Sequence, residues 1–84
     1  MPTDHAKALI EALKIAKASK NGLPIQIQNA VSEIVNSSDP QAQGKRANEV
    51  TRWLYSESNQ PGVDQFTVMG YNALRNALEP FIQQ

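Results

Sequence analysis

The sequence contains no cysteine and a single histidine in 84 residues. Without thiols it cannot form disulfides, a thiolate nucleophile or a cysteine metal site, and such a composition suits a reducing compartment. The one imidazole, His5, has no carboxylate at metal-ligand spacing, and it stands in an N-terminal segment too frayed to position a serine nucleophile. No glycine-rich phosphate loop is present. We therefore expect no catalytic residue, no metal and no cofactor, and a protein that is not an enzyme.

Net charge and long apolar runs are also missing. Eight basic and eight acidic residues balance, so no overall field draws the chain to nucleic acid or to an anionic membrane. No apolar run approaches the ~20 residues that a membrane span needs, and the N-terminal residues do not resemble a signal peptide. We expect a cytoplasmic protein without membrane contact, folded as a single domain over residues 1–84 because a chain of this length builds one core.

What the sequence does contain is helical periodicity. Four stretches carry apolar residues at the three- and four-residue spacing of amphipathic helices. Asn21-Gly22, Asp39-Pro40 and Pro61-Gly62 supply stop, cap and turn signals between them. The sequence predicts an all-α fold, a compact bundle of about four helices over residues 4–20, 24–37, 40–58 and 65–79.

Four details of this bundle remain to be tested. Apolar residues cover more than half the circumference of the first helix, which is typical of a central helix touching several neighbours or of a helix at a dimer interface, and central packing is favoured. Pro80 is expected to stop or kink the last helix, and Gly70 on its apolar side indicates close approach of another helix, beside Trp53. Residues 25–28 also alternate like a strand that could pair with 66–68, but a lone ribbon is marginal, so helix is favoured.

Residues 45–55 organise the chain because they hold the only Trp and one of the two Tyr residues. At 100° per residue, Trp53 falls on the apolar side with the core, whereas Glu49 falls on the polar side, where it can pair with neighbouring cations. A tyrosine near arginine is the composition of interface hot spots, and Tyr55 lies off the apolar arc. The candidate partner-binding residues are Lys45, Asn48, Arg52, Tyr55, Tyr71 and Arg75.

We therefore expect a small protein-interaction or regulatory module, an inhibitor or adaptor that binds a larger protein, with homodimerisation as a further possibility. One alternative is a DNA-binding regulator that uses residues 40–58 or 65–79, since Asn and Arg read base edges. The 58–63 connection is longer than a helix-turn-helix turn, and zero net charge weakens non-specific affinity. A second alternative is a structural subunit that assembles through the broad apolar arc of the first helix.

Overall fold

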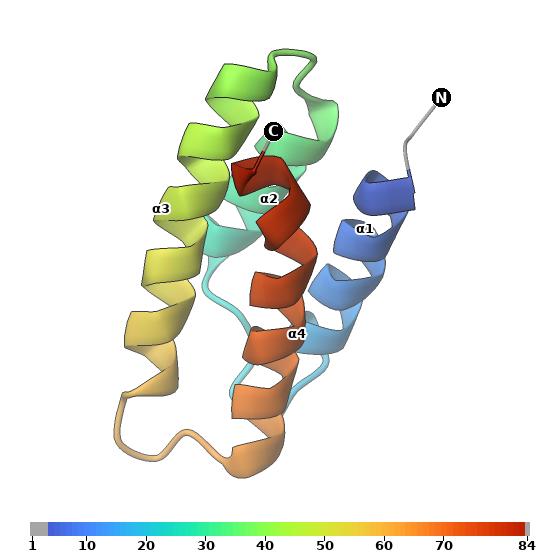
Figure 1. Cartoon of the computed structure of the whole chain (residues 1–84). Helices are drawn as coiled ribbons and strands as arrows, with labels where there is room; N and C mark the ends of the chain where they lie inside the picture. Colours follow the sequence, from blue (N-terminus) through green and yellow to red (C-terminus); the bar gives the residue numbers. More distant parts are fainter. Residues whose placement is uncertain (1–3, 84) are drawn as a thin grey trace.

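A computed structural model describes residues 4–83, and these form four α-helices joined by short loops (Figure 1). Residues 1–3 and 84, which the expected single domain includes, lie outside the described part. Successive helices alternate in direction, so the bundle is up-down-up-down. The predicted all-α bundle is confirmed, and residues 25–28 and 66–68 are helical. The helices are α1 (Asp4–Lys17), α2 (Ile25–Asn36), α3 (Pro40–Ser58) and α4 (Gln65–Ile82).

The helix ends follow from local capping. Asp39 accepts a hydrogen bond from the backbone N–H of Gln41 at 3.1 Å, and Pro40 occupies the first turn, so α3 begins where the sequence predicts. The first helix ends at Lys17 rather than at residue 20. There, the Ser19 hydroxyl donates to the Ala16 carbonyl at 2.7 Å and takes up an acceptor of the last turn.

Pro80 does not end α4, which continues to Ile82, so the predicted stop is wrong. A proline inside a helix removes one backbone hydrogen bond, to the carbonyl four residues earlier. Here that loss falls in the last turn, where few bonds remain to be disturbed. The continued helix buries Phe81, whose side chain is 6% exposed and belongs to the core. Burial of this ring stabilises the final turn against the cost of the proline.

The helices pack as a four-membered ring. The most extensive contacts are those of α4 with α3 and with α1, and α2 packs on α3, whereas α1 and α2 touch over a smaller area. Within residues 4–83, no Cα of α1 lies within 8 Å of one in α3, and the same holds for α2 and α4. The predicted central position of the first helix is therefore wrong. Its apolar arc is wide because part of it, including Ile15 at 57% exposure, faces solvent.

The core lies inside this ring and draws on all four helices. Leu54 of α3 has no exposed surface, but Trp53 is only partly buried at the edge of the core, which corrects the expectation that the indole lies inside. Trp53 points toward the α2 side of α3, where the Arg46 guanidinium lies 5.5 Å from its ring centroid. The largest fully buried side chains are Tyr71, Leu9, Ile34, Leu54, Leu74, Leu78, Val31, Val50 and Thr67.

The loop between α1 and α2 is tied to the start of α4. The Tyr71 hydroxyl donates to the Gly22 carbonyl at 2.6 Å, and the Asn21 backbone N–H donates to Thr67 Oγ1 at 3.4 Å. The Thr67 hydroxyl donates to the Asp64 carboxylate, which also accepts from the Thr67 N–H at 3.0 Å. These bonds to the charged form hold the pKa of Asp64 below its ordinary value of 3.8. Tyr71 is therefore a structural residue, 2% exposed, and not a surface residue as predicted.

Tyr71→Phe tests this anchor. Removing the hydroxyl deletes the bond to Gly22, and we expect the free energy of unfolding to fall by about 1 kcal/mol at pH 8. Burial, with a smaller contribution from Glu57, raises the pKa of Tyr71 above its ordinary value of 10.0. The folded protein therefore keeps this proton longer than the unfolded chain, so the stabilisation is complete below pH 10 and is lost as the pH rises above it.

Urea unfolding at pH 8 and at pH 10.5 measures both effects of Tyr71→Phe. Lysines titrate in the same range, so the difference between the two proteins is the relevant quantity. The wild-type protein should lose more stability between the two pH values than the variant does. Equal losses would contradict the buried, neutral phenol.

Gly70 and Gly44 both lie inside helices, but we expect alanine at the two positions to have different effects on stability. A Cβ on Gly70 would lie 3.6 Å from Ala16 Cα, an ordinary contact, so α1 and not Trp53 is the neighbour at this close approach. A Cβ on Gly44 would lie 3.1 Å from the Phe81 carbonyl oxygen. Because alanine favours a helix by about 1 kcal/mol over glycine, we expect Gly70→Ala to raise the free energy of unfolding. Gly44→Ala should gain less or lose stability, and thermal denaturation of both variants ranks them. The reverse order would contradict these contacts.

Candidate protein-binding face

The position of α3 in the ring gives it two flanks, one toward α4 and one toward α2. Tyr55 lies on the α4 flank, and the Arg75 guanidinium of α4 stacks on it with its carbon 5.3 Å from the ring centroid. Tyr55 nevertheless remains 59% exposed. Two of the predicted site residues, 20 positions apart in the sequence, are thus brought into contact.

A pocket of about 330 Å³ lies beside this pair, lined by polar side chains of α3 and α4. Arg75 Nη1 donates to Asn72 Oδ1 at 3.2 Å, which fixes the guanidinium at the pocket wall. Thr51 Oγ1 and Arg75 Nε are buried, and neither atom forms a hydrogen bond with another protein atom within residues 4–83. Because the protein itself covers these two atoms, a partner at this pocket would meet the exposed side-chain amides of Asn72 and Asn76 instead. The lining residues are Thr51, Asn72, Arg75, Asn76 and Glu79.

The other predicted residues divide between this surface and its surroundings. Asn48 and Arg52 are exposed, and they precede Tyr55 by seven and three positions, so they continue its side of α3. Lys45 is also exposed but borders a different pocket, toward α2. Tyr71 belongs to neither surface. We name the remaining surface the α3/α4 face, made of Asn48, Thr51, Arg52, Tyr55, Asn72, Arg75, Asn76 and Glu79.

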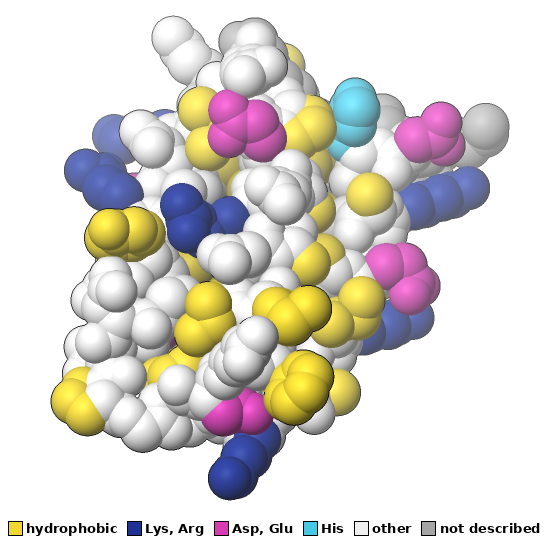
Figure 2. Space-filling model, turned by 60° about the horizontal axis from the view of Figure 1, so that its bottom comes forward, with side chains coloured by type: hydrophobic (Ala, Val, Ile, Leu, Met, Phe, Trp, Pro, Cys, Tyr) yellow, Lys and Arg dark blue, Asp and Glu magenta, His cyan; other side chains and the backbone are white. Residues whose placement is uncertain are grey.

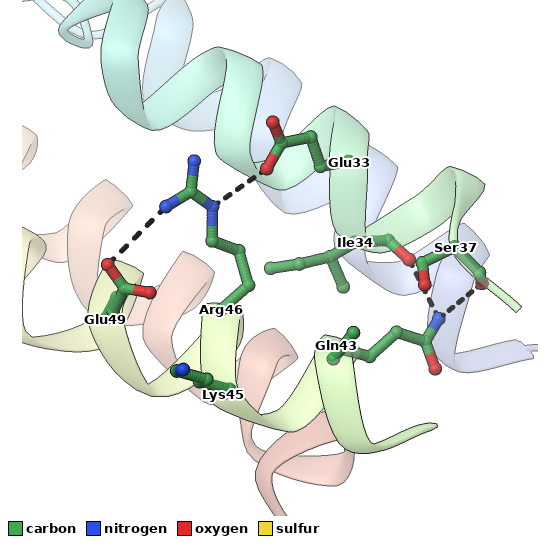
Figure 3. A pocket seen from close by; sticks show the side chains of 8 residues that line it. Glu33, Ile34, Ser37, Gln43, Lys45, Arg46 and Glu49 are labelled. Carbon is green, nitrogen blue, oxygen red and sulfur yellow. Dashed lines mark hydrogen bonds and ion pairs between the residues drawn. The ribbon is translucent and has the colours of Figure 1, made fainter. Parts of the chain in front are cut away.

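The second pocket, of about 300 Å³, lies where α2 ends and α3 begins (Figure 3). Gln43 closes one side, because its Nε2 donates to the carbonyls of Ile34 at 2.8 Å and Ser37 at 2.9 Å. This side chain thereby satisfies carbonyls at the end of α2. The polar groups here hold two helices together, which favours a structural role for the pocket. Its lining consists of Glu33, Ile34, Ser37, Ala42, Gln43, Lys45, Arg46 and Glu49.

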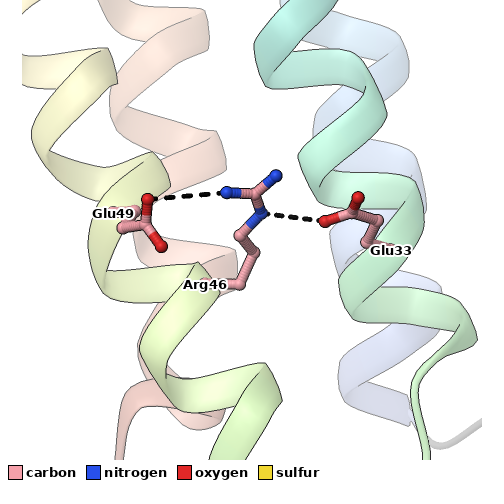
Figure 4. A network of polar contacts seen from close by, with 3 residues as sticks. All are labelled: Glu33, Arg46 and Glu49. Atoms are coloured by element: carbon pink, nitrogen blue, oxygen red, sulfur yellow. Dashed lines mark hydrogen bonds and ion pairs between the residues drawn. The ribbon is translucent and has the colours of Figure 1, made fainter.

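Arg46 lies between two carboxylates on that side (Figure 4). Its Nε is 2.8 Å from Glu33 of α2, and its Nη1 is 3.5 Å from Glu49 on its own helix. Glu49 therefore pairs with Arg46, and within residues 4–83 no ion pair joins it to Lys45 or Arg52, the two partners that helical spacing predicts. These groups are partly exposed, and each such pair contributes about 0–1 kcal/mol. The two carboxylates neutralise the charge of Arg46. Of the three basic residues of α3, only Lys45 and Arg52 would then attract a nucleic acid.

Sequence reasoning missed Thr51, Asn72, Asn76 and Glu79 as members of the α3/α4 face. The spacing of Asn76 and Glu79 places them with Arg75 on the polar side of α4, so the signal for these two was present. The missing information was that α3 borders that polar side. Thr51 carries no signal of its own, since a half-buried threonine is ordinary in a helix.

Two negative observations concern the described part of the chain. Residues 4–83 contain no cluster of three or more His, Asp or Glu side chains placed to hold a metal ion. None of the helices over the same residues combines the length and apolar character needed to cross a membrane.

Comparison of the chain with protein-family models, with curated proteins and with solved structures finds no match.

Proposed function

We propose that the protein is a small, non-enzymatic protein-binding module, an adaptor or inhibitor that docks on a larger protein through the α3/α4 face. The observation that carries the proposal is the stacking of Tyr55 on Arg75, with the tyrosine 59% exposed. Tyrosine and arginine are the residue types enriched at interface hot spots. A ring already held by a neighbouring helix loses little side-chain freedom on binding, which lowers the entropic cost of association.

The chemistry of the face indicates the kind of partner surface that fits it. Arg75 stacks on the Tyr55 ring, exposed Arg52 precedes Tyr55 by one turn on α3, and Glu79 adds an acidic group to the lining of the neighbouring pocket. The three asparagines offer both donors and acceptors. A complementary surface presents an apolar patch to the ring and carboxylates to the arginines, with backbone amides around them. The absence of cysteine supports a cytoplasmic setting for this interaction.

The test compares capture by three immobilised proteins from a native lysate, with half of each sample treated with nuclease. The proteins are the wild type, Tyr55→Ala and Ile25→Ala. Ile25 is the matched control because it is also an exposed apolar side chain, at 67%, but belongs to α2. A protein retained by the wild type and by Ile25→Ala, lost with Tyr55→Ala and unaffected by nuclease supports the proposal.

Two results would overturn it. Recovery of nucleic acid, with binding weakened by Lys45→Glu and Arg52→Glu and every captured protein lost after nuclease, would make α3 a nucleic-acid-binding helix. Capture that is the same for all three immobilised proteins would show that the α3/α4 face is not the binding surface.

A further inference from the structure

The loop between α1 and α2 contains the only Asn-Gly pair of the sequence, Asn21-Gly22. Gly22 has a φ of 68°, a left-handed backbone conformation that residues with a Cβ rarely adopt, so the fold needs glycine at this position. The same glycine has no Cβ to shield its backbone nitrogen from the side chain that precedes it. Asn21 is exposed, so water also reaches the pair. The remaining asparagines all precede larger residues.

Hydrogen bonds hold both halves of this pair in place. Asn21 Oδ1 accepts from the backbone N–H of Asp64 at 3.3 Å, and Asn21 Nδ2 donates to the Gly62 carbonyl at 3.4 Å. The backbone N–H of Gly22 donates to the Ser19 carbonyl at 2.9 Å. The Gly22 nitrogen can therefore reach Cγ of Asn21 only after its own bond breaks and the asparagine side chain turns away from its partners.

The surroundings of Asn21 disfavour a negative charge at this position. Thr67 Oγ1 lies 3.0 Å from Asn21 Oδ1 and also within hydrogen-bond distance of the Asp64 carboxylate. One hydroxyl group would thus separate a carboxylate at position 21 from that of Asp64, and like charges this close repel. After the hydrogen bond from Thr67, the charge of Lys20 also lowers the pKa of Asp64. Figure 2, which brings this end of the bundle forward, shows acidic and basic side chains meeting at its lower edge.

We infer that Asn21 is a site of spontaneous deamidation, that the folded loop restrains the reaction, and that its product releases the loop from α4. The Gly22 nitrogen forms a bond to Cγ of Asn21, the Cγ–Nδ2 bond breaks, and the side-chain nitrogen takes up the proton of the Gly22 N–H and leaves as ammonia. The product of this step is a succinimide ring. Water then adds to one of the two ring carbonyls and breaks its bond to nitrogen, which leaves aspartate or isoaspartate at position 21.

Either product disrupts the contacts of this loop. Loss of Nδ2 removes the donor to the Gly62 carbonyl and places a carboxylate beside Asp64. Isoaspartate also lengthens the main chain by one carbon atom, which displaces the Gly22 carbonyl from the Tyr71 hydroxyl that donates to it at 2.6 Å. Because the ammonia is lost, the modified fraction of the protein records how long the loop has spent open. This inference does not involve the α3/α4 face, so it is independent of the proposed function.

Mass spectrometry of tryptic peptides tests the site. The peptide of residues 21–45 contains Asn21 together with Asn29 and Asn36, two exposed asparagines of α2 that serve as internal controls. The wild type is incubated at pH 8, both folded and in concentrated guanidinium chloride, and fragmentation locates the mass change. In denaturant, Asn21 should deamidate faster than either control. In the folded protein, deamidation of Asn21 should be at least about tenfold slower than in denaturant.

Two variants test the restraint. Thr67→Val keeps the size of the side chain but removes the hydroxyl that contacts Asn21, and Tyr71→Phe frees the Gly22 carbonyl. Each should speed deamidation of Asn21 in the folded protein several-fold, and circular dichroism checks that both variants are folded. An unchanged rate in both variants, or equal rates for the folded and denatured wild type, would overturn the restraint. A rate in denaturant no higher than that of Asn29 would overturn the site itself.

Asn21→Asp tests the effect of the product. We expect its melting temperature to be at least about 4 °C below that of the wild type, since it loses a hydrogen bond and gains a repulsive charge. Asn29→Asp is the matched control, because it makes the same change at an exposed position on α2. Its melting temperature should stay closer to that of the wild type. Equal shifts in the two variants would overturn the release of the loop.

Discussion

Replacing Tyr55 with alanine is expected to weaken binding of the protein partner at least about 30-fold. This corresponds to about 2 kcal/mol, the loss that defines a hot-spot residue. The substitution removes the exposed ring and also releases the Arg75 side chain that stacks on it. The substitution therefore removes the aromatic contact and also the fixed position of the arginine beside it. Isothermal titration calorimetry with the captured partner, at fixed ionic strength, measures the change.

Phenylalanine at position 55 is the control for this experiment. Tyr55→Phe keeps the ring and its stacking on Arg75, so its affinity should fall no more than about fivefold, the value of a single hydrogen bond. Because the side chain is 59% exposed, both variants should keep the stability of the wild type. Equal losses of affinity in the two variants would contradict the stacked ring as the source of binding energy.

Leu74→Ala is expected to lower the free energy of unfolding by about 3 kcal/mol. Leu74 has no exposed surface, and it lies on the helix that packs against both α3 and α1. The substitution loses the transfer free energy of the removed carbons and leaves a cavity that the neighbouring helices cannot fill. For a domain of this length, the melting temperature should fall by about 12–24 °C. Thermal unfolding followed by circular dichroism measures the shift.

Ile25→Ala is the matched control for Leu74→Ala, because it also truncates an aliphatic side chain but one that is 67% exposed. Its unfolding free energy should change by no more than about 0.5 kcal/mol. A comparable loss in the two variants would contradict the placement of Leu74 in the core.

The fold class was accessible from the sequence because its signals are local. Asp39-Pro40 and the turn at Pro61-Gly62 set the predicted bounds of α3, which the structure confirms over Pro40–Ser58. Which helices contact one another was not accessible. A wide apolar arc on α1 is compatible with a central helix or with a helix whose arc is partly exposed at the surface of the bundle. The predicted end of the last helix before Pro80 was wrong for a related reason. Its local cost was clear, but the burial of Phe81 that outweighs it depends on the neighbouring helices.

The candidate site was predictable one helix at a time. Tyr55 and Arg75 were each identified from position and residue type, but their contact depends on which flanks of α3 and α4 meet. Tyr71 was misassigned because a residue at the edge of an apolar stripe is exposed or buried according to what covers it. Here the Gly22 carbonyl, in the loop between α1 and α2, lies over its hydroxyl. Contacts between segments this far apart have no local signature.

The alternating directions of four helices bring the beginning of α1 and the end of α4 to the same end of the bundle (Figure 1). Since α4 already packs against α1, a linker from residue 83 to residue 4 would convert this pair into one more helical hairpin. Every pair of helices in contact would then be consecutive in the sequence, and new termini could be introduced in any of the loops. In its topology the fold is circular, so circular permutation changes the order of the helices without changing which helices touch.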